Sequence, residues 1–511
     1  MQRNLIIGGV AALVVAFLAF GAYFGLRAGS GDMALAQVDR IVNAHDGEYE
    51  SASYDTDEDR LIIDGLVLRN YLTDPEAEPL DLVEIDHLDV SGLARFNLRD
   101  VLSGGRTQNV FSVLTATGIT LTEGGQVINV ERFTARDVAL VSTDAFDGAD
   151  DGVQLTRQEE VAQLALLLHA GEVGVSGFES PAEGPTGMRL DELVLSDMRA
   201  GTIGRITASG ASLWDNGQMG TVGDTVRLDV GHMTLDGLDA RVPLGRMARG
   251  EDVRFERQSN MPLYDVFTAD NILMEQERGE PLALAAVSIE NDEYEGPMPT
   301  ETAVSISALR LPLAADFIDP QETASLRNLG YDELIFNFAY RAGYDFDTRT
   351  FSLMGMSVGV DDMGELQMDF EVSGIPFSED MIDQSAEALL QDDFIAALLE
   401  QAAMEVGSLS YTDHGLFDRV VSANAEKAGQ TREEYVQAAV DGLRAEREEV
   451  ASSEPAVQAI DALIAFFETP GTLTMTVAPD APVPVQQMVL ATQINPLILV
   501  ELLNLQVTAS N

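Results

Sequence analysis

The feature that most constrains this fold is a strand pattern that shifts phase at one residue and then recurs along the chain. In Ile203–Leu213 (IGRITASGASL), Ile206 and Ala208 alternate with polar residues, and after Gly210 the alternation resumes one residue later. Side chains on a strand alternate between its two faces with period two. A straight strand with this sequence would therefore expose its second apolar half to water.

The same pattern occurs in four other places. With the first residue numbered zero, the apolar positions are +3, +5, +8 and +10, and position +7 is Gly or Asp. The other copies begin at Phe111, Val130, Leu190 and Val230, with Gly118, Asp137, Asp197 and Gly237 at position +7. Either a β-bulge or a tight turn at position +7 explains the shift, because both residue types tolerate positive φ. Both explanations predict a β-rich region from about residue 50 to residue 260. They place the residues at +5 and +8 in one apolar layer.

The N-terminal segment predicts a membrane anchor. Residues 5–26 carry no charge, and as a helix they would be about 33 Å long, enough to cross a bilayer. The alternative is a signal peptide cleaved near Ala34-Leu35-Ala36, although the apolar run is long for one. Gly21 and Gly25 form a G-x-x-x-G motif that favours pairing of two such helices, and so a homo-oligomer.

The charge of the chain excludes one class of partner. With 85 acidic and 30 basic residues, the formal net charge is −55, and such a surface repels the phosphates of nucleic acids. Arg3 precedes the apolar run, while acidic residues soon follow Arg27, which places the bulk of the chain outside the cytoplasm. The chain has no cysteine, so disulfides and thiol chemistry are excluded.

The rest of the chain predicts an α+β, β-rich fold: an N-terminal transmembrane helix, a curved and bulged antiparallel sheet, and a mixed, mainly helical C-terminal region with short strands. Thr156 and Glu159 predict the start of a helix that ends at Gly171. Amphipathic periodicity begins near residue 378. We expect three parts: an anchor over 1–30, a repetitive β-rich region with helical insertions over 31–376, and the mainly helical region over 377–511.

No motif for catalysis, cofactor binding or metal binding emerges, so no residue is assigned to a catalytic, cofactor or metal site. Lys427, the only lysine, precedes Ala428, which excludes a Walker loop. The five histidines form no pair at metal-ligand spacing. Asp55, Asp57 and Asp59 resemble the start of a calcium-binding EF-hand loop, but Arg60 stands where that loop needs glycine. Asp144–Gly152 (DAFDGADDG) is either an ordinary acidic loop or a weak cation site.

Residues 328–374 (NLGYDELIFNFAYRAGYDFDTRTFSLMGMSVGVDDMGELQMDFEVSG) form a meander of alternating apolar and polar residues. With this meander, the repeated strands and the N-terminal run, the chain resembles AsmA-type envelope proteins and, more closely, YdgA-like anchored periplasmic proteins. The resemblance covers roughly residues 5–375. It implies a curved sheet, a single-pass position in the bacterial inner membrane with the bulk of the chain in the periplasm, and a link to lipid handling.

Three functions are consistent with the sequence. The first is a non-enzymatic structural or interaction module of the cell envelope, whose sheet has its apolar face filled by helices and which binds an envelope protein. The second is a lipid-binding or lipid-transfer protein of AsmA-like type, in which that face forms an open groove for an acyl chain. The third is an unrecognised hydrolase. The sequence shows no cofactor. The decisive observation is whether the apolar face is open or covered.

Overall fold

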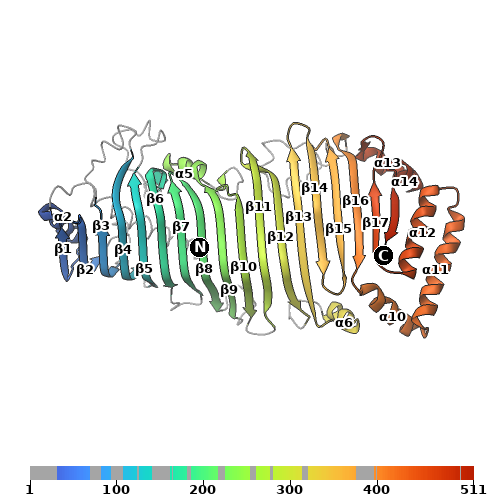
Figure 1. Ribbon diagram of the computed structural model, residues 1–511, viewed down its shortest axis with the longest axis horizontal. Helices are drawn as coiled ribbons and strands as arrows, with labels where there is room; N and C mark the ends of the chain where they lie inside the picture. The colour runs from blue at the N-terminus through green and yellow to red at the C-terminus, as the bar shows by residue number, and fades with distance from the viewer. Residues whose placement is uncertain are drawn as a thin grey trace. The chain divides into compact units, whose positions relative to one another are not determined.

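The computed structural model describes residues 31–69, 82–93, 107–123, 126–140, 162–163, 165–180, 186–216, 225–251, 253, 260–276, 280–313, 320–375, 396, 398, 400–494 and 496–510. The chain divides into two compact units: residues 1–256 with 260–269, and residues 257–259 with 270–511. We call them unit 1 and unit 2. The described residues of each unit form antiparallel strands in meander order (Figure 1).

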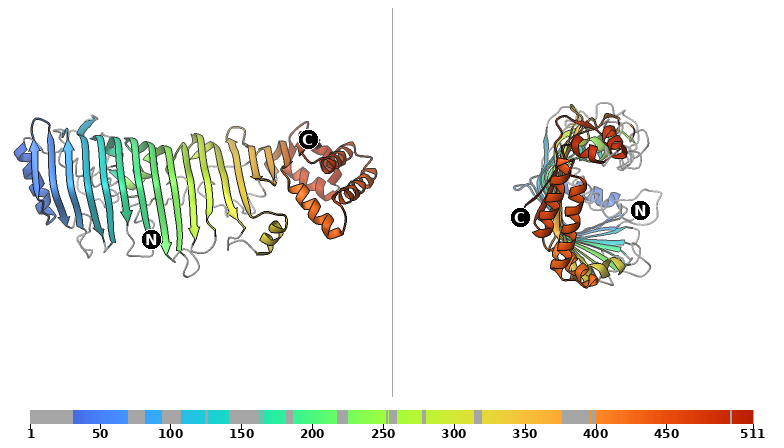
Figure 2. Two further views of the ribbon diagram at one scale, coloured as in Figure 1. Left: turned by 60° about the horizontal axis from the view of Figure 1, so that its bottom comes forward. Right: turned by 90° about the vertical axis from the view of Figure 1, so that its right-hand side faces the viewer.

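In unit 1, nine strands pair in the order in which they occur in the chain, so that each strand is the neighbour of the next. The helix α2 (Gly31–Ala44) precedes them and lies against one face of the sheet (Figure 2). The strands are β1 (Ser51–Asp55), β2 (Arg60–Arg69), β3 (Leu82–Ser91), β4 (Gln108–Glu123), β5 (Gln126–Leu140), β6 (Leu168–Ser180), β7 (Thr186–Arg199), β8 (Thr202–Asn216) and β9 (Thr225–Asp239), followed by α5 (Arg241–Ala248).

The strand β10 (Val266–Gln276) carries the chain from unit 1 into unit 2. In unit 2, strands β11 to β17 again pair consecutively, except that β18 pairs with β16 and β19 pairs with β17. The strands are β11 (Leu282–Glu295), β12 (Met298–Pro312), β13 (Glu333–Asp345), β14 (Thr350–Val360), β15 (Gly364–Ser373), β16 (Ala403–Asp413), β17 (Thr472–Val477), β18 (Val483–Pro484) and β19 (Gln506–Ser510). The helices are α6 (Pro320–Asn328), α10 (Leu416–Ala428), α11 (Arg432–Glu449), α12 (Glu454–Glu468), α13 (Val485–Ile494) and α14 (Pro496–Leu502).

The phase shift predicted from sequence lies inside long strands, not at turns. All five residues at position +7 have positive φ, including Gly118 (60°) and Gly210 (62°). In the copy that begins at Phe111, Ala116 at +5 and Ile119 at +8 are both buried in the same core. The register between β4 and β5 nevertheless runs unbroken past Gly118, because β5 shifts phase at the same level. The irregularity at Gly118 is therefore shared by neighbouring strands, and it is neither a tight turn nor a bulge confined to one strand, the two alternatives that the sequence left open.

Packing between strands explains why position +7 is Gly or Asp. A Cβ placed on Gly118 would lie 2.0 Å from the Asp86 carboxylate of the neighbouring strand, and one on Gly210 would lie 2.2 Å from the Asp191 carboxylate. Where Asp137 or Asp197 adopts the positive φ instead, glycine faces it from the next strand. Each of these pairs of facing residues, on or next to neighbouring strands, thus contains one glycine, whose missing side chain makes room for the side chain opposite. The facing pairs are Glu50–Gly65, Asp86–Gly118, Glu131–Gly177, Asp191–Gly210, Gly92–Ser112, Asp137–Gly171, Asp197–Gly204 and Gly237–Asp265.

The expected fold class is wrong in its helical parts. The described residues form a mostly antiparallel β-structure that continues into residues 377–511, where β16, β17 and β19 extend the unit 2 sheet. Alternating sequences such as Thr472–Val477 (TLTMTV) allow this pairing. Within the described ranges, no helix has the length and apolar character needed to cross a bilayer, because the longest, α11, is rich in charged residues. The expectation of a transmembrane helix is therefore not met by any described helix; residues 5–26, with Gly21 and Gly25, lie outside the described residues.

The helix predicted to start at Thr156 ends earlier than expected. Thr156 and Glu159 lie outside the described residues, and strand β6 already begins at Leu168. Gly171 therefore does not cap a helix. It lies within β6, facing Asp137 of β5, where its missing side chain leaves room for the aspartate.

Candidate functional site

The candidate site is the apolar face of the unit 2 sheet, here defined by one residue on each of five strands: Val287, Ile306, Phe338, Val358 and Leu366. The strand register places each of these residues directly beside the next, from β11 to β15. Because neighbouring strands lie about 4.8 Å apart, the row is about 19 Å long. The first four residues are half-buried, and Leu366 is 38% exposed. The five residues of the row are of the types that form a protein core, but they are less buried than core residues.

Unit 1 contains a matching row that is closed. Ile63, Leu88, Ala116 and Phe133 lie side by side on β2 to β5, and all four are 0% exposed. Helix α2 contributes part of the cover through Val38, Ile41 and Val42, which belong to the same buried cluster. The same row continues over β6 to β9 with Val175, Leu193, Ala208 and Met233, of which Leu193 and Met233 are only half-buried. The face is therefore covered at one end of unit 1 and opens along the row.

The apolar face of unit 2 has a covered end as well. Beyond Leu366 the row reaches Tyr411 on β16 and Leu473 on β17. There α12 packs on the sheet, with the Phe466 ring 6.1 Å from that of Tyr411. Burial, followed by the hydrogen bond that the hydroxyl donates to Asp413 at 3.0 Å, raises the pKa of Tyr411 well above its usual value. The phenol of Tyr411 therefore stays neutral.

The opposite face of the same strands is polar. Its residues alternate with those of the apolar row; they include Ser305, Ala339 and Ser357. An open hollow of about 390 Å³ lies on this side among Ser288, Ala303, Ala339 and Gly355, whose short side chains leave the space. At its edge, Arg341 donates a hydrogen bond to Glu301. One side of the unit 2 sheet is thus suited to water and the other to apolar groups.

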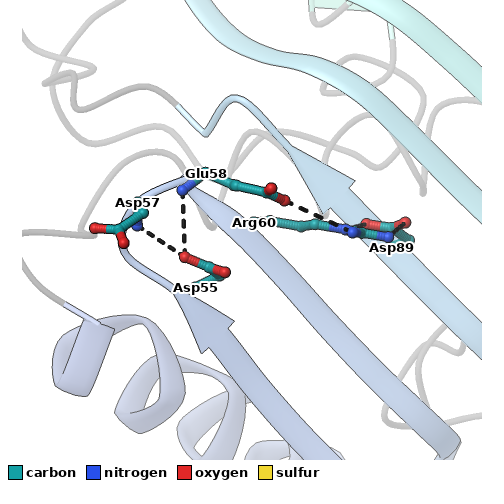
Figure 3. A network of polar contacts seen from close by, with 5 residues as sticks. All are labelled: Asp55, Asp57, Glu58, Arg60 and Asp89. Atoms are coloured by element: carbon teal, nitrogen blue, oxygen red, sulfur yellow. Dashed lines mark hydrogen bonds and ion pairs between the residues drawn. The ribbon is translucent and has the colours of Figure 1, made fainter.

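The aspartates that resembled an EF-hand loop have a structural role. The Asp55 carboxylate accepts hydrogen bonds from the backbone N–H groups of Asp57 (2.8 Å) and Glu58 (3.3 Å), which closes the turn between β1 and β2 (Figure 3). Arg60 makes two hydrogen bonds to Asp89 of β3, at 3.0 and 2.7 Å. Across the described ranges, no group of three or more His, Cys, Asp or Glu could hold a metal ion. The acidic stretch Asp144–Gly152 lies outside those ranges.

One histidine belongs to a polar cluster that the sequence did not predict. His87 Nδ1 lies 2.7 Å from Asp64 Oδ1, and the Ser51 hydroxyl donates to Asp64 Oδ2 at 2.8 Å. The hydrogen bond with His87, and then that with Ser51, lowers the pKa of the Asp64 carboxyl. Because the aspartate lies between the other two, His87 cannot take a proton from Ser51, and the cluster lacks the order of a nucleophilic triad. The cluster joins β1, β2 and β3 on the face of the sheet opposite to the buried Ile63.

Comparison with known proteins adds one finding. Residues 357–510 match a family model that is described only as an uncharacterized protein. The match begins within β14 and extends through β19, so it includes Val358, Leu366 and the helices α10 to α14. No curated protein matches the chain. The matched family therefore covers part of the candidate site and assigns it no activity.

Proposed function

We propose that this chain is a non-enzymatic binding protein that holds an extended apolar ligand, such as a lipid acyl chain, on the apolar face of unit 2. The observation that carries the proposal is the unbroken row from Val287 to Leu366, whose side chains remain half-buried or exposed. Exposed contiguous apolar surface is unfavourable in water and marks a binding site when it is rimmed by polar residues.

The composition of the row favours a chain-like ligand over a compact polar one. All five side chains are aliphatic or aromatic, and the row ends beside Tyr411, whose hydroxyl is already bonded to Asp413. An acyl chain would gain roughly 25 cal/mol for each square ångström of apolar surface removed from water, without requiring a fixed hydrogen-bond geometry. The net charge of −55 disfavours strongly anionic ligands in free solution.

Photo-crosslinking of the full chain in the cells that produce it tests the proposal. Phe338→p-benzoylphenylalanine places the reactive group in the row by extending the existing ring with a benzoyl group. Ala339→p-benzoylphenylalanine places it on the opposite face of the same strand. We expect a lipid-mass adduct from the variant at 338 and a much weaker one from the variant at 339. Equal adducts at both positions, no lipid adduct at 338, or a protein adduct in its place would contradict the proposal.

A further inference from the structure

Unit 2 carries a second apolar surface, formed by α13 and α14. Val489 (43% exposed), Leu490 (52%), Ile494 (76%) and Ile498 (42%) all project into solvent, and we call these four residues the α13–α14 patch. Leu490 and Ile494 lie one helical turn apart and so share one side of α13. Ala491, between them in sequence, is only 5% exposed and faces the protein. The patch is therefore the outward side of a helix that is anchored through its other side.

The patch lies in a stretch without charge. Residues 481–500 contain no Asp, Glu, Lys or Arg, although 23% of the whole chain is charged. The exposed polar neighbours on α13, Gln487, Thr492 and Gln493, are neutral. Val242 and Met354, by contrast, are large exposed apolar side chains that lie outside both this patch and the apolar row of the sheet, and such scattered residues are common in soluble domains. The α13–α14 patch combines clustering with the absence of charge.

We propose that the α13–α14 patch docks at the surface of a lipid bilayer and inserts Leu490 and Ile494 among the headgroups and upper acyl chains. Ile494, the most exposed of the four, ends α13 just before α14 begins, so it stands at the junction of the two helices. A few aliphatic side chains at such a junction suit shallow insertion. A stable protein interface, by contrast, occupies about 800 Å² on each partner.

The charge of the chain determines which bilayer fits. A chain with a net charge of −55 is repelled by anionic headgroups, while the uncharged patch allows close approach to zwitterionic ones. Added salt screens the repulsion over about 10 Å at 0.1 M. Docking is therefore strongest on zwitterionic vesicles. It weakens when anionic lipid is added at low salt, and it recovers at high salt. Basic peripheral proteins show the opposite dependence.

The absence of cysteine makes a local test straightforward in the full chain. Ile494→Cys is labelled with the environment-sensitive fluorophore NBD, and Met354→Cys, originally 43% exposed on a strand of the same unit, is the matched control. With phosphatidylcholine vesicles, we expect a blue shift and quenching by nitroxide lipids at position 494 only. Leu490→Gln added to the 494 variant should reduce both signals several-fold.

Three results would overturn this proposal: an unchanged 494 label, equal changes at 494 and 354, or a concentration-dependent change at 494 without vesicles, which would indicate that two copies associate through the patch. Vesicle binding through another segment would bring the labels at 494 and 354 near lipid alike, so the comparison of these two positions isolates docking by α13. It is also independent of the proposed ligand on the row from Val287 to Leu366, which lies on the sheet.

Discussion

Gly118 of β4 faces Asp86 of β3 so closely that a Cβ on Gly118 would lie 2.0 Å from the aspartate carboxylate, and Gly118 has a φ of 60°. The two residues show how neighbouring strands of unit 1 shift phase together. A side chain at position 118 would be disfavoured twice, by the backbone conformation and by the neighbour.

Gly118→Ala should destabilise unit 1 by about 1–3 kcal/mol, because it combines a positive φ with a steric clash. Asp86→Gly in the same background should restore part of the loss by removing the clash while leaving the backbone strain. Hydrogen exchange of unit 1 peptides during urea unfolding provides the measurement.

Gly442→Ala serves as the control for that substitution. Gly442 lies within α11, without positive φ and with nothing within 4 Å of an added Cβ. Alanine should therefore stabilise α11 by up to about 1 kcal/mol. If Gly118→Ala proved as harmless as Gly442→Ala, the account of the facing pairs would be wrong.

Phe133 and Phe338 occupy comparable rows in the two units, but Phe133 is 0% exposed and Phe338 is half-buried. Phe133→Ala should cost unit 1 about 3–5 kcal/mol, as for a closed core. Phe338→Ala should cost unit 2 roughly half of the ~1.5–3 kcal/mol that full burial of such a side chain is worth. Urea unfolding of each variant gives both values; similar losses would show that the Phe338 face is as closed as that of Phe133.

The Asp64 cluster should respond to acid. The hydrogen bond with His87 is the main cause of the lowered pKa of Asp64 in the folded protein. The hydrogen bonds of Asp64 therefore stabilise the fold fully above the ordinary aspartate pKa of about 4. This stabilisation is lost as the pH falls through the lowered pKa of the folded state. His87→Ala should raise the pKa of Asp64 towards its ordinary value. Ser51→Ala should raise it less, because the Ser51 bond is the smaller cause. Titration of the Asp64 carboxyl carbon by NMR measures both shifts, and a larger effect of Ser51→Ala would contradict this ranking.

The phase of the apolar pattern was predictable because it depends on each strand alone. Residues such as Ala116 and Ile119 reveal their common layer through spacing. The pairing of Gly118 with Asp86 was not predictable, because it depends on the register between strands, which no local pattern records. The same limit explains the errors at Gly171, where a strand partner outweighed a helix-ending signal, and at Ala403–Asp413, which pairs as a strand inside a region expected to be mainly helical.

The candidate site could be predicted only in part from the sequence. The sequence predicted an apolar sheet face and left open whether helices cover it. The answer differs along the molecule, because cover depends on contacts between distant segments: Val38 of α2 meets the closed row of unit 1, and Phe466 of α12 meets Tyr411 of unit 2. No local signal distinguishes Phe133, which is fully buried, from Phe338, which is only half-buried.

The most direct test of the central claim measures access to the apolar face of unit 2 in the otherwise cysteine-free chain. Three single variants are compared by their rate of reaction with a maleimide: Val358→Cys on the apolar face, Ser357→Cys on the opposite face, and Val175→Cys in the closed part of unit 1, where Val175 is 2% exposed. We expect position 358 to react readily and to be protected by added monoolein, whose headgroup is uncharged, while 357 reacts regardless of monoolein and 175 hardly reacts. A thiol at position 358 that is as unreactive as that at 175, or that monoolein leaves unprotected, would contradict an open apolar face on unit 2.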